Sequence, residues 1–104
     1  MEPRVEDRPE MSRYEILAGA DTIETAGFTE YFLSEGEIAF LHTETAPRFA
    51  GQGLGGLLAR SVLDDVRARG LHVLPYCPFL QGWIRKHPEY ADLVPEGHRA
   101  RFGL

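Results

Sequence analysis

A run of apolar residues at helical spacing constrains the fold of this 104-residue chain more than any other feature. Between residues 53 and 69 the apolar positions recur at intervals of three and four; they are Leu54, Leu57, Leu58, Val62, Leu63 and Val66. This spacing gives a helix one apolar side, which a sheet or another helix has to cover. Gly70 suits the left-handed position just past the end of such a helix.

Three β-strands are predicted before this helix. They cover residues 14–18, 22–33 and 38–45, where β-branched and aromatic side chains are frequent or apolar and polar residues alternate. The connections at residues 19–21 and 34–37 are short and contain glycine, so we expect consecutive strands to be antiparallel. Gly27 is expected to mark a bulge, and the third strand should stop near Pro47, which cannot donate to a strand ladder.

After the helix, residues 71–74 predict a short apolar strand. Because a helical crossover joins it to the third strand, we expect the two to run parallel. Pro78 suits the first position of a second, short helix that ends before Pro88. Residues 98–104 resemble a loosely held basic end. The sequence therefore predicts an α/β (α+β) fold: a mixed, mostly antiparallel sheet with a crossover helix and a short closing helix.

The first eleven residues contain two prolines, six charged side chains and almost nothing to bury. Such a segment does not offset the entropy lost on ordering, so we expect a disordered tail at residues 1–11 and a single domain at residues 12–104. The hydrophobic content of 43% is sufficient for one core.

The formal net charge of −5 argues against nucleic acid as a partner. No apolar run approaches the roughly 20 residues that cross a bilayer, so no membrane association is expected. The single cysteine excludes an internal disulfide and favours a reducing compartment, which predicts a cytoplasmic protein. One cysteine and four histidines without paired spacing predict no metal site.

Four glycines, Gly51, Gly53, Gly55 and Gly56, lie between the third predicted strand and the long helix. Glycines at a helix start let the backbone approach a phosphate, and the unpaired N–H groups of the first turn attract an anion. The ending of a nucleotide-hydrolysing P-loop and the acidic residue of a dinucleotide fold are both missing. A glycine-rich turn that only lets the helix pack closely remains the alternative interpretation.

The order Arg48-x-x-Gly51-x-Gly53-Leu54-Gly55 resembles the pyrophosphate-binding signature of the GNAT superfamily of N-acetyltransferases. Three further blocks are similar to a minimal, single-domain GNAT subgroup: HTET at residues 42–45, LPYCPF at residues 74–79 and IRKHPEY at residues 84–90. The resemblance covers residues 12–94. This chain departs from the pattern at Thr45, where valine is expected, and at the Gly55-Gly56 pair, where alanine is common.

The resemblance implies that acetyl-coenzyme A is the co-substrate, without a metal, and that an acetyl group moves to a primary amine. The residues expected to bind coenzyme A are Thr43, Thr45, Arg48, Gly51, Gln52, Gly53, Leu54, Gly55, Gly56 and Arg85. The cofactor should lie at the C-terminal ends of the third and fourth strands, in a monomer or weak dimer. A non-catalytic module that binds coenzyme A or acyl-coenzyme A is the alternative, and an interaction domain with a structural glycine loop is a third.

Cys77 is expected to be catalytic. It directly precedes Pro78 and so occupies the N-cap of the second predicted helix, where the helix dipole and free N–H groups favour a thiolate. Its role would be either to accept the acetyl group or to return a proton to the departing coenzyme A thiolate. The alternative is a small buried hydrophobe.

Glu44 is the predicted general base, acting on the incoming ammonium directly or through water. Because Glu44 ends the third strand and Cys77 follows the fourth, we expect the two side chains to converge where the sheet opens. A solvated carboxylate is the alternative for Glu44. For His87, on an apolar helical stripe, a packing role is expected.

Overall fold

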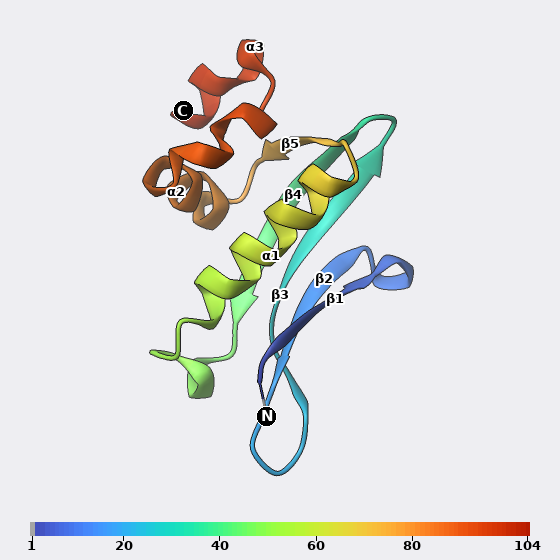
Figure 1. Cartoon of the computed structure of the whole chain (residues 1–104), viewed down its shortest axis with the longest axis vertical. Coiled ribbons are helices and arrows are strands. Elements are labelled where there is room, and N and C mark those ends of the chain that lie inside the picture. Colours follow the sequence, from blue (N-terminus) through green and yellow to red (C-terminus); the bar gives the residue numbers. More distant parts are fainter. Residues whose placement is uncertain (1) are drawn as a thin grey trace.

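A five-stranded sheet in the order β1-β2-β3-β4-β5 forms the frame of the computed structural model, which describes residues 2–104 (Figure 1). The strands are β1 (Arg4–Arg8), β2 (Arg13–Ala18), β3 (Glu24–Ser34), β4 (Glu37–Thr45) and β5 (His72–Pro75). Strands β1 to β4 are successively antiparallel, and β5 runs parallel to β4. The predicted mixed, mostly antiparallel sheet is confirmed.

The crossover helix α1 (Leu54–Ala68) lies across one face of this sheet (Figure 1). Its apolar side is buried as the spacing predicted, apart from Leu57, which is 38% exposed. Opposite it, Ile16, Ile38 and Phe40 have no exposed surface. Each such side chain contributes roughly 1.5–3 kcal/mol by burial.

Two further helices follow β5. Helix α2 (Pro78–Lys86) is the predicted closing helix, and α3 (Glu96–Arg99) is a single turn. Short 3-10 turns occupy Pro9–Met11, Pro47–Phe49, Pro88–Leu93 and Ala100–Phe102. None of the helices within residues 2–104 is long and apolar enough to span a membrane.

Two bulges change which side chains face α1. In β3 the extra residue is Ala26, next to the predicted position at Gly27. In β4 the extra residue is Leu41, because Glu30 pairs with His42 while Tyr31 pairs with Phe40. One inserted residue reverses the alternation of faces beyond it. Before Leu41 the even-numbered residues of β4 face the helices, and after it the odd-numbered residues do.

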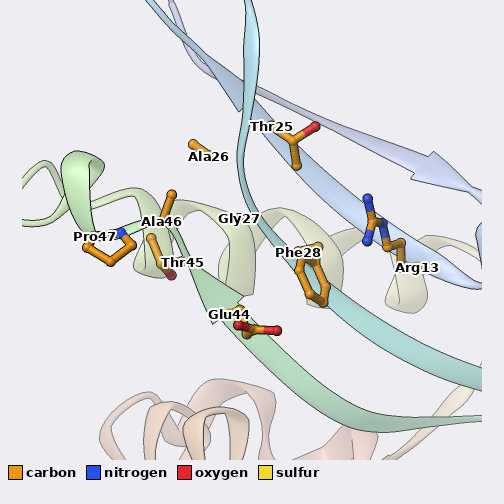
Figure 2. Close-up of a pocket in the computed structure, with 9 residues that line it drawn as sticks. All are labelled: Arg13, Thr25, Ala26, Gly27, Phe28, Glu44, Thr45, Ala46 and Pro47. Atoms are coloured by element: carbon orange, nitrogen blue, oxygen red, sulfur yellow. The ribbon is translucent and has the colours of Figure 1, made fainter.

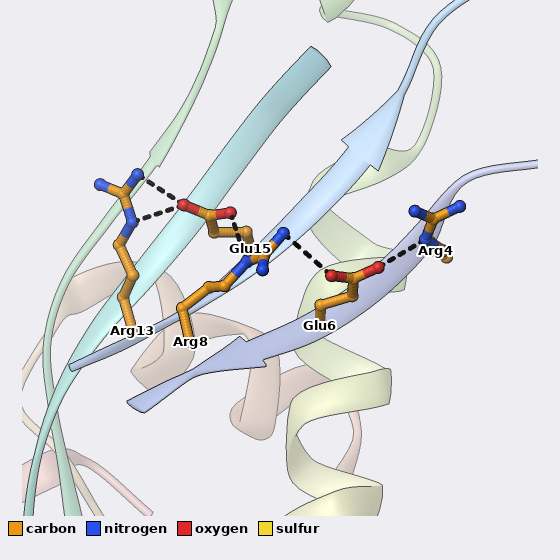
Figure 3. A network of polar contacts seen from close by, with 5 residues as sticks. All are labelled: Arg4, Glu6, Arg8, Arg13 and Glu15. Atoms are coloured by element: carbon orange, nitrogen blue, oxygen red, sulfur yellow. Dashed lines mark hydrogen bonds and ion pairs between the residues drawn. The ribbon is translucent and has the colours of Figure 1, made fainter. Parts of the chain in front are cut away.

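The predicted disordered tail at residues 1–11 is wrong for residues 4–11. Residues 4–8 form β1, which pairs with β2 along its whole length and continues into the 3-10 turn at residues 9–11. Figure 3 shows where its charges lie: Glu6 pairs with Arg4 and Arg8 within β1, and Glu15 of β2 pairs with Arg8 and Arg13. Only the contact between Arg8 and Glu15 joins the two strands, and the backbone pairing and the partly buried Val5 also hold the segment in place.

The C-terminal segment is also held more firmly than the sequence predicted. Phe102 is buried, and its ring packs edge-on against Tyr76. Arg85 donates from Nη1 to the carbonyl oxygen of Phe102 at 3.1 Å. The end of the chain is thereby fastened to α2.

Candidate active site

The segment before α1 leaves its backbone open. Gly51 and Gly53 have φ angles of 80° and 73°, and a Cβ added at either would meet no atom within 4 Å. Gly53 is the N-cap of α1 and offers no side-chain cap, and the first turn carries no acidic residue. Unpaired N–H groups at a positive dipole end suit an anion. The segment therefore fits a diphosphate, the group that coenzyme A would bring.

Gly55 and Gly56 have a different role from the other two glycines. A Cβ at Gly55 would come within 3.3 Å of the Phe79 ring, and one at Gly56 within 3.7 Å of Trp83 Nε1. Both aromatic residues belong to α2, so these glycines let α2 approach α1 closely. The structural interpretation of the glycine cluster thus applies to its second pair.

Strands β4 and β5 separate at Phe40. Their parallel pairing extends from Glu37 with His72 to Phe40 with Pro75. Beyond it, the N–H of Cys77 donates to the Phe40 carbonyl at 3.1 Å, and the chain turns into α2. The rest of β4 continues beside β3 alone. The bulge at Leu41 coincides with this separation, which opens the sheet beside the start of α2.

Cys77 is the N-cap of α2, as predicted, but its side chain is only 1% exposed and makes no capping hydrogen bond. Its Sγ lies 3.3 Å from Thr43 Oγ1, which in turn bonds to Thr29 Oγ1 at 2.9 Å. Thr29 is also 1% exposed. The sequence analysis missed Thr29; the only available signal was its position two residues before the core residue Tyr31 on a predicted strand.

Glu44 does not converge with Cys77. It lies between Thr43 and Thr45, which face the helices, so its side chain points to the opposite face of the sheet. Figure 2 shows it there beside Phe28 and Arg13, lining a cavity of about 270 Å³. Its carboxylate is exposed and pairs with His42 Nε2 at 3.0 Å. The expected convergence is wrong because the bulge at Leu41 reverses the faces of the residues after it.

The predicted cationic partners of coenzyme A have contacts within the chain. The Arg48 guanidinium pairs with Glu24 and lies 5.2 Å from the centre of the Phe49 ring. Arg85 holds the C-terminal segment, as described above. Gln52 is exposed and lines a cavity of about 420 Å³ together with Phe49 and residues of the β2–β3 turn. Backbone N–H groups, more than side-chain charges, are therefore what the loop offers a diphosphate.

His87 has a packing role. Its ring stacks on Trp83 with 3.8 Å between the ring centres, and its Nδ1 lies 2.8 Å from the Trp83 carbonyl oxygen. No group of three His, Cys, Asp or Glu side chains that could hold a metal ion occurs in the described part of the chain.

Charged and phenolic groups gather at the far end of α1. Tyr14 donates to Asp65 Oδ2 at 2.6 Å and accepts from Arg69 Nη1 at 2.8 Å. Tyr31 donates to Asp7 Oδ1 at 2.6 Å. Burial, reinforced by the neighbouring carboxylates, raises the pKa of both phenols above the ordinary value near 10. These tyrosines therefore stay neutral and anchor the C-terminal end of the helix.

The sheet order, the crossover helix and the open glycine segment together define a small α+β domain of the N-acetyltransferase type. A model of the GCN5-related N-acetyl-transferase family matches residues 13–93. The chain belongs to this family, and the resemblance identified from its motifs is confirmed. By class it is an acyltransferase.

A solved structure supports the same fold. The solution structure of a GCN5-like candidate N-acetyltransferase from Staphylococcus aureus is 22% identical and superimposes with a TM-score of 0.65. The match covers 88% of this chain and 87% of that one. No curated protein matches the chain.

Proposed function

We propose that this chain transfers an acetyl group from acetyl-coenzyme A to a primary amine. The observation that carries the proposal is the open backbone at Gly51 and Gly53, at an uncapped start of α1, beside the separation of β4 and β5. A diphosphate bound at the helix start leaves the rest of the cofactor free to extend toward the gap between the strands.

We place Cys77 at the reacting thioester. Its backbone N–H binds the Phe40 carbonyl where β4 and β5 separate, and its sulfur lies at the start of α2. It either accepts the acetyl group or returns a proton to the coenzyme A thiolate. Its 1% exposure means that acetyl-coenzyme A reaches it only by displacing the side chains that cover it.

Glu44 is the proposed base, and its place on the open face makes this the side from which the amine arrives. It directly follows Thr43, whose hydroxyl contacts the Cys77 sulfur, but its own side chain points to the opposite face of the sheet. From that face Glu44 deprotonates the ammonium on its approach or through water. The exposed carboxylate and the chain's net charge of −5 favour a cationic acceptor.

Two measurements test the proposal. Calorimetry with coenzyme A tests whether the cofactor binds at all; no binding by the folded chain contradicts the proposal and favours a purely structural glycine loop. An assay of thiol release over a panel of amines then separates an acetyltransferase from a module that only binds acyl-coenzyme A. We expect Cys77→Ala to retain coenzyme A affinity and lose transfer. Mass spectrometry for an acetylated Cys77 peptide distinguishes its two roles.

A further inference from the structure

A chain of three side chains crosses the buried side of the sheet at the proposed catalytic cysteine. Cys77 Sγ, Thr43 Oγ1 and Thr29 Oγ1 are joined by contacts of 3.3 and 2.9 Å. They come from the start of α2, from β4 and from β3, and Thr43 lies directly opposite Thr29 in the strand register. The end members are each 1% exposed, so water is excluded from both.

The three linked side chains have two hydrogen-bonded states, one with the thiol and one with the thiolate of Cys77. A threonine hydroxyl has one hydrogen, so Thr43 donates either to Thr29 or to the sulfur. When Thr43 donates to Thr29, the contact between Thr43 and Cys77 is a hydrogen bond only if the S–H of Cys77 is its donor. If the sulfur loses its proton, Thr43 turns its hydrogen to the thiolate and Thr29 donates to Thr43.

Both proposed roles of Cys77 require this second state. As an acid, Cys77 gives its S–H proton to the coenzyme A thiolate, which becomes the free thiol, and Cys77 is left as a thiolate. As a nucleophile, the Cys77 thiolate forms a bond to the acetyl carbon, and the bond from that carbon to the coenzyme A sulfur breaks with its electron pair on that sulfur. A thiolate in a nearly dry site needs a hydrogen-bond donor.

We propose that Thr43 is the positioning residue that supplies this donor to the Cys77 thiolate, and that Thr29 makes the reversal of Thr43 possible. The proposal rests on the proposed role of Cys77. Thr43 is the one side chain with a hydrogen bond to Sγ among the described residues, and the N-cap geometry gives the sulfur no bond to the first turn of α2. Neither threonine needs to touch the substrate for this role.

The test is the titration of Cys77 in the full chain without acetyl-coenzyme A. Because the chain has one cysteine, a β-carbon isotope label there gives an NMR signal from this thiol alone. We expect Thr43→Val to raise the midpoint by about one to two pH units, a ten- to hundredfold smaller thiolate fraction near neutral pH. Thr43→Ser, which keeps the hydroxyl, should restore the midpoint. Thr22→Val makes the same chemical change in an exposed turn and should leave it unchanged.

Thr29→Val leaves the contact of Thr43 with the sulfur in place and removes only the partner behind it. Because the charge of a thiolate polarises the bond between the two threonines, losing that bond should raise the midpoint by less than about one pH unit. Thr29→Ser should restore it. These two variants decide the question if Thr43→Val does not fold, and a Thr29→Val midpoint equal to that of the wild type overturns the relay.

The remaining outcomes separate this inference from the proposed function. If Thr43→Val titrates like the wild type, or if valine and serine shift the midpoint equally, the hydroxyl has no role and the inference is overturned even where acetyl transfer is found. If the midpoints shift as expected, the pH profile of kcat/KM should shift with them: its acid limb if Cys77 attacks as a thiolate, its alkaline limb if Cys77 acts as the acid. If the midpoints of the variants shift but the wild type transfers no acetyl group, the relay is supported and the proposed acetyl transfer is overturned.

Discussion

The two ends of helix α1 are built in opposite ways. At its start, Gly53 offers no side-chain cap and the first turn carries no acidic residue. At its end, Asp65 and Arg69 share hydrogen bonds with Tyr14, and Arg69 also pairs with Asp7 of β1. The polar side-chain contacts of the helix are therefore concentrated at the end away from the candidate site. The end that would bind the cofactor packs against α2 but has no side-chain cap.

The largest expected effect comes from removing residues 1–11, which reach the anchored end through Asp7. Deletion removes the bonds of Asp7 to Tyr31 and Arg69 and exposes the β2 edge. We expect a loss of roughly 2–4 kcal/mol of stability, measured by denaturant unfolding. Coenzyme A affinity, measured where the variant is folded, should change much less. An unchanged unfolding free energy would show that β1 does not hold the helix.

The second prediction uses two glycines with almost the same backbone. Gly53 and Gly70 have φ angles of 73° and 71°, and a Cβ at either would meet no atom within 4 Å. Replacing either with alanine costs about 1–2 kcal/mol of folding stability through left-handed strain.

The two variants differ in what a ligand would meet. We expect Gly53→Ala to lower coenzyme A affinity by roughly tenfold or more, about 1.4 kcal/mol, because the added methyl group stands where the diphosphate approaches. Gly70→Ala, at the anchored end, should bind as the wild type does. If the two variants bind coenzyme A with equal affinity in calorimetry, the two ends of α1 do not differ in function.

The third prediction concerns pH. The folded pKa of Tyr14 is raised by burial and by Asp65, so its contribution to stability is complete below the ordinary value near 10 and is lost as the pH rises past it. Tyr14→Phe should lower the folding stability by about 1 kcal/mol near neutral pH, and the stability of this variant should decline less steeply in alkaline solution than that of the wild type. Thermal melts at a series of pH values measure both effects. Parallel pH profiles of variant and wild type would contradict this.

The smallest effect is expected from Arg67, which binds Asp92 through two contacts of 2.8 and 2.9 Å. The hydrogen bonds from Arg67 lower the pKa of Asp92, so the pair contributes above the ordinary carboxylate range and is lost as the pH falls through the lowered value. Both groups are exposed, so Arg67→Ala should shift the melting temperature only slightly, and less still in high salt. A salt-independent loss would show that packing, not charge, is involved.

The elements that were predicted correctly carry local signals. The stripe of α1, the turn glycines and Pro78 at the start of α2 each depend on residues near in sequence, and the structure confirms all three. The assignment of β1 failed because the partners of Asp7, which are Tyr31 and Arg69, are distant in sequence. Charged residues without known partners are indistinguishable from a solvated tail.

The candidate site was predicted in part for the same reason. Cys77 was placed correctly at the N-cap, while its burial and its link to Thr29 depend on how β3 is paired with β4. Under strict alternation Glu44 shares a face with Phe40, the face that meets the helices. The extra residue Leu41 places the Glu44 side chain on the opposite face of the sheet, and no local sequence signal predicts this bulge.

The strand order has a consequence for the sequence of folding events. Strands β1 to β4 are joined by short connections and pair with their neighbours along the chain, so they can form early as local hairpins. The pairing of β5 with β4 has to wait for the crossover through α1, so Cys77 and α2 dock last. A unit that docks on an already formed sheet can open while that sheet stays folded. Native-state hydrogen exchange should therefore show the amides of α2 exchanging before those of β2 and β3, and each such opening exposes the thiol while the meander stays folded.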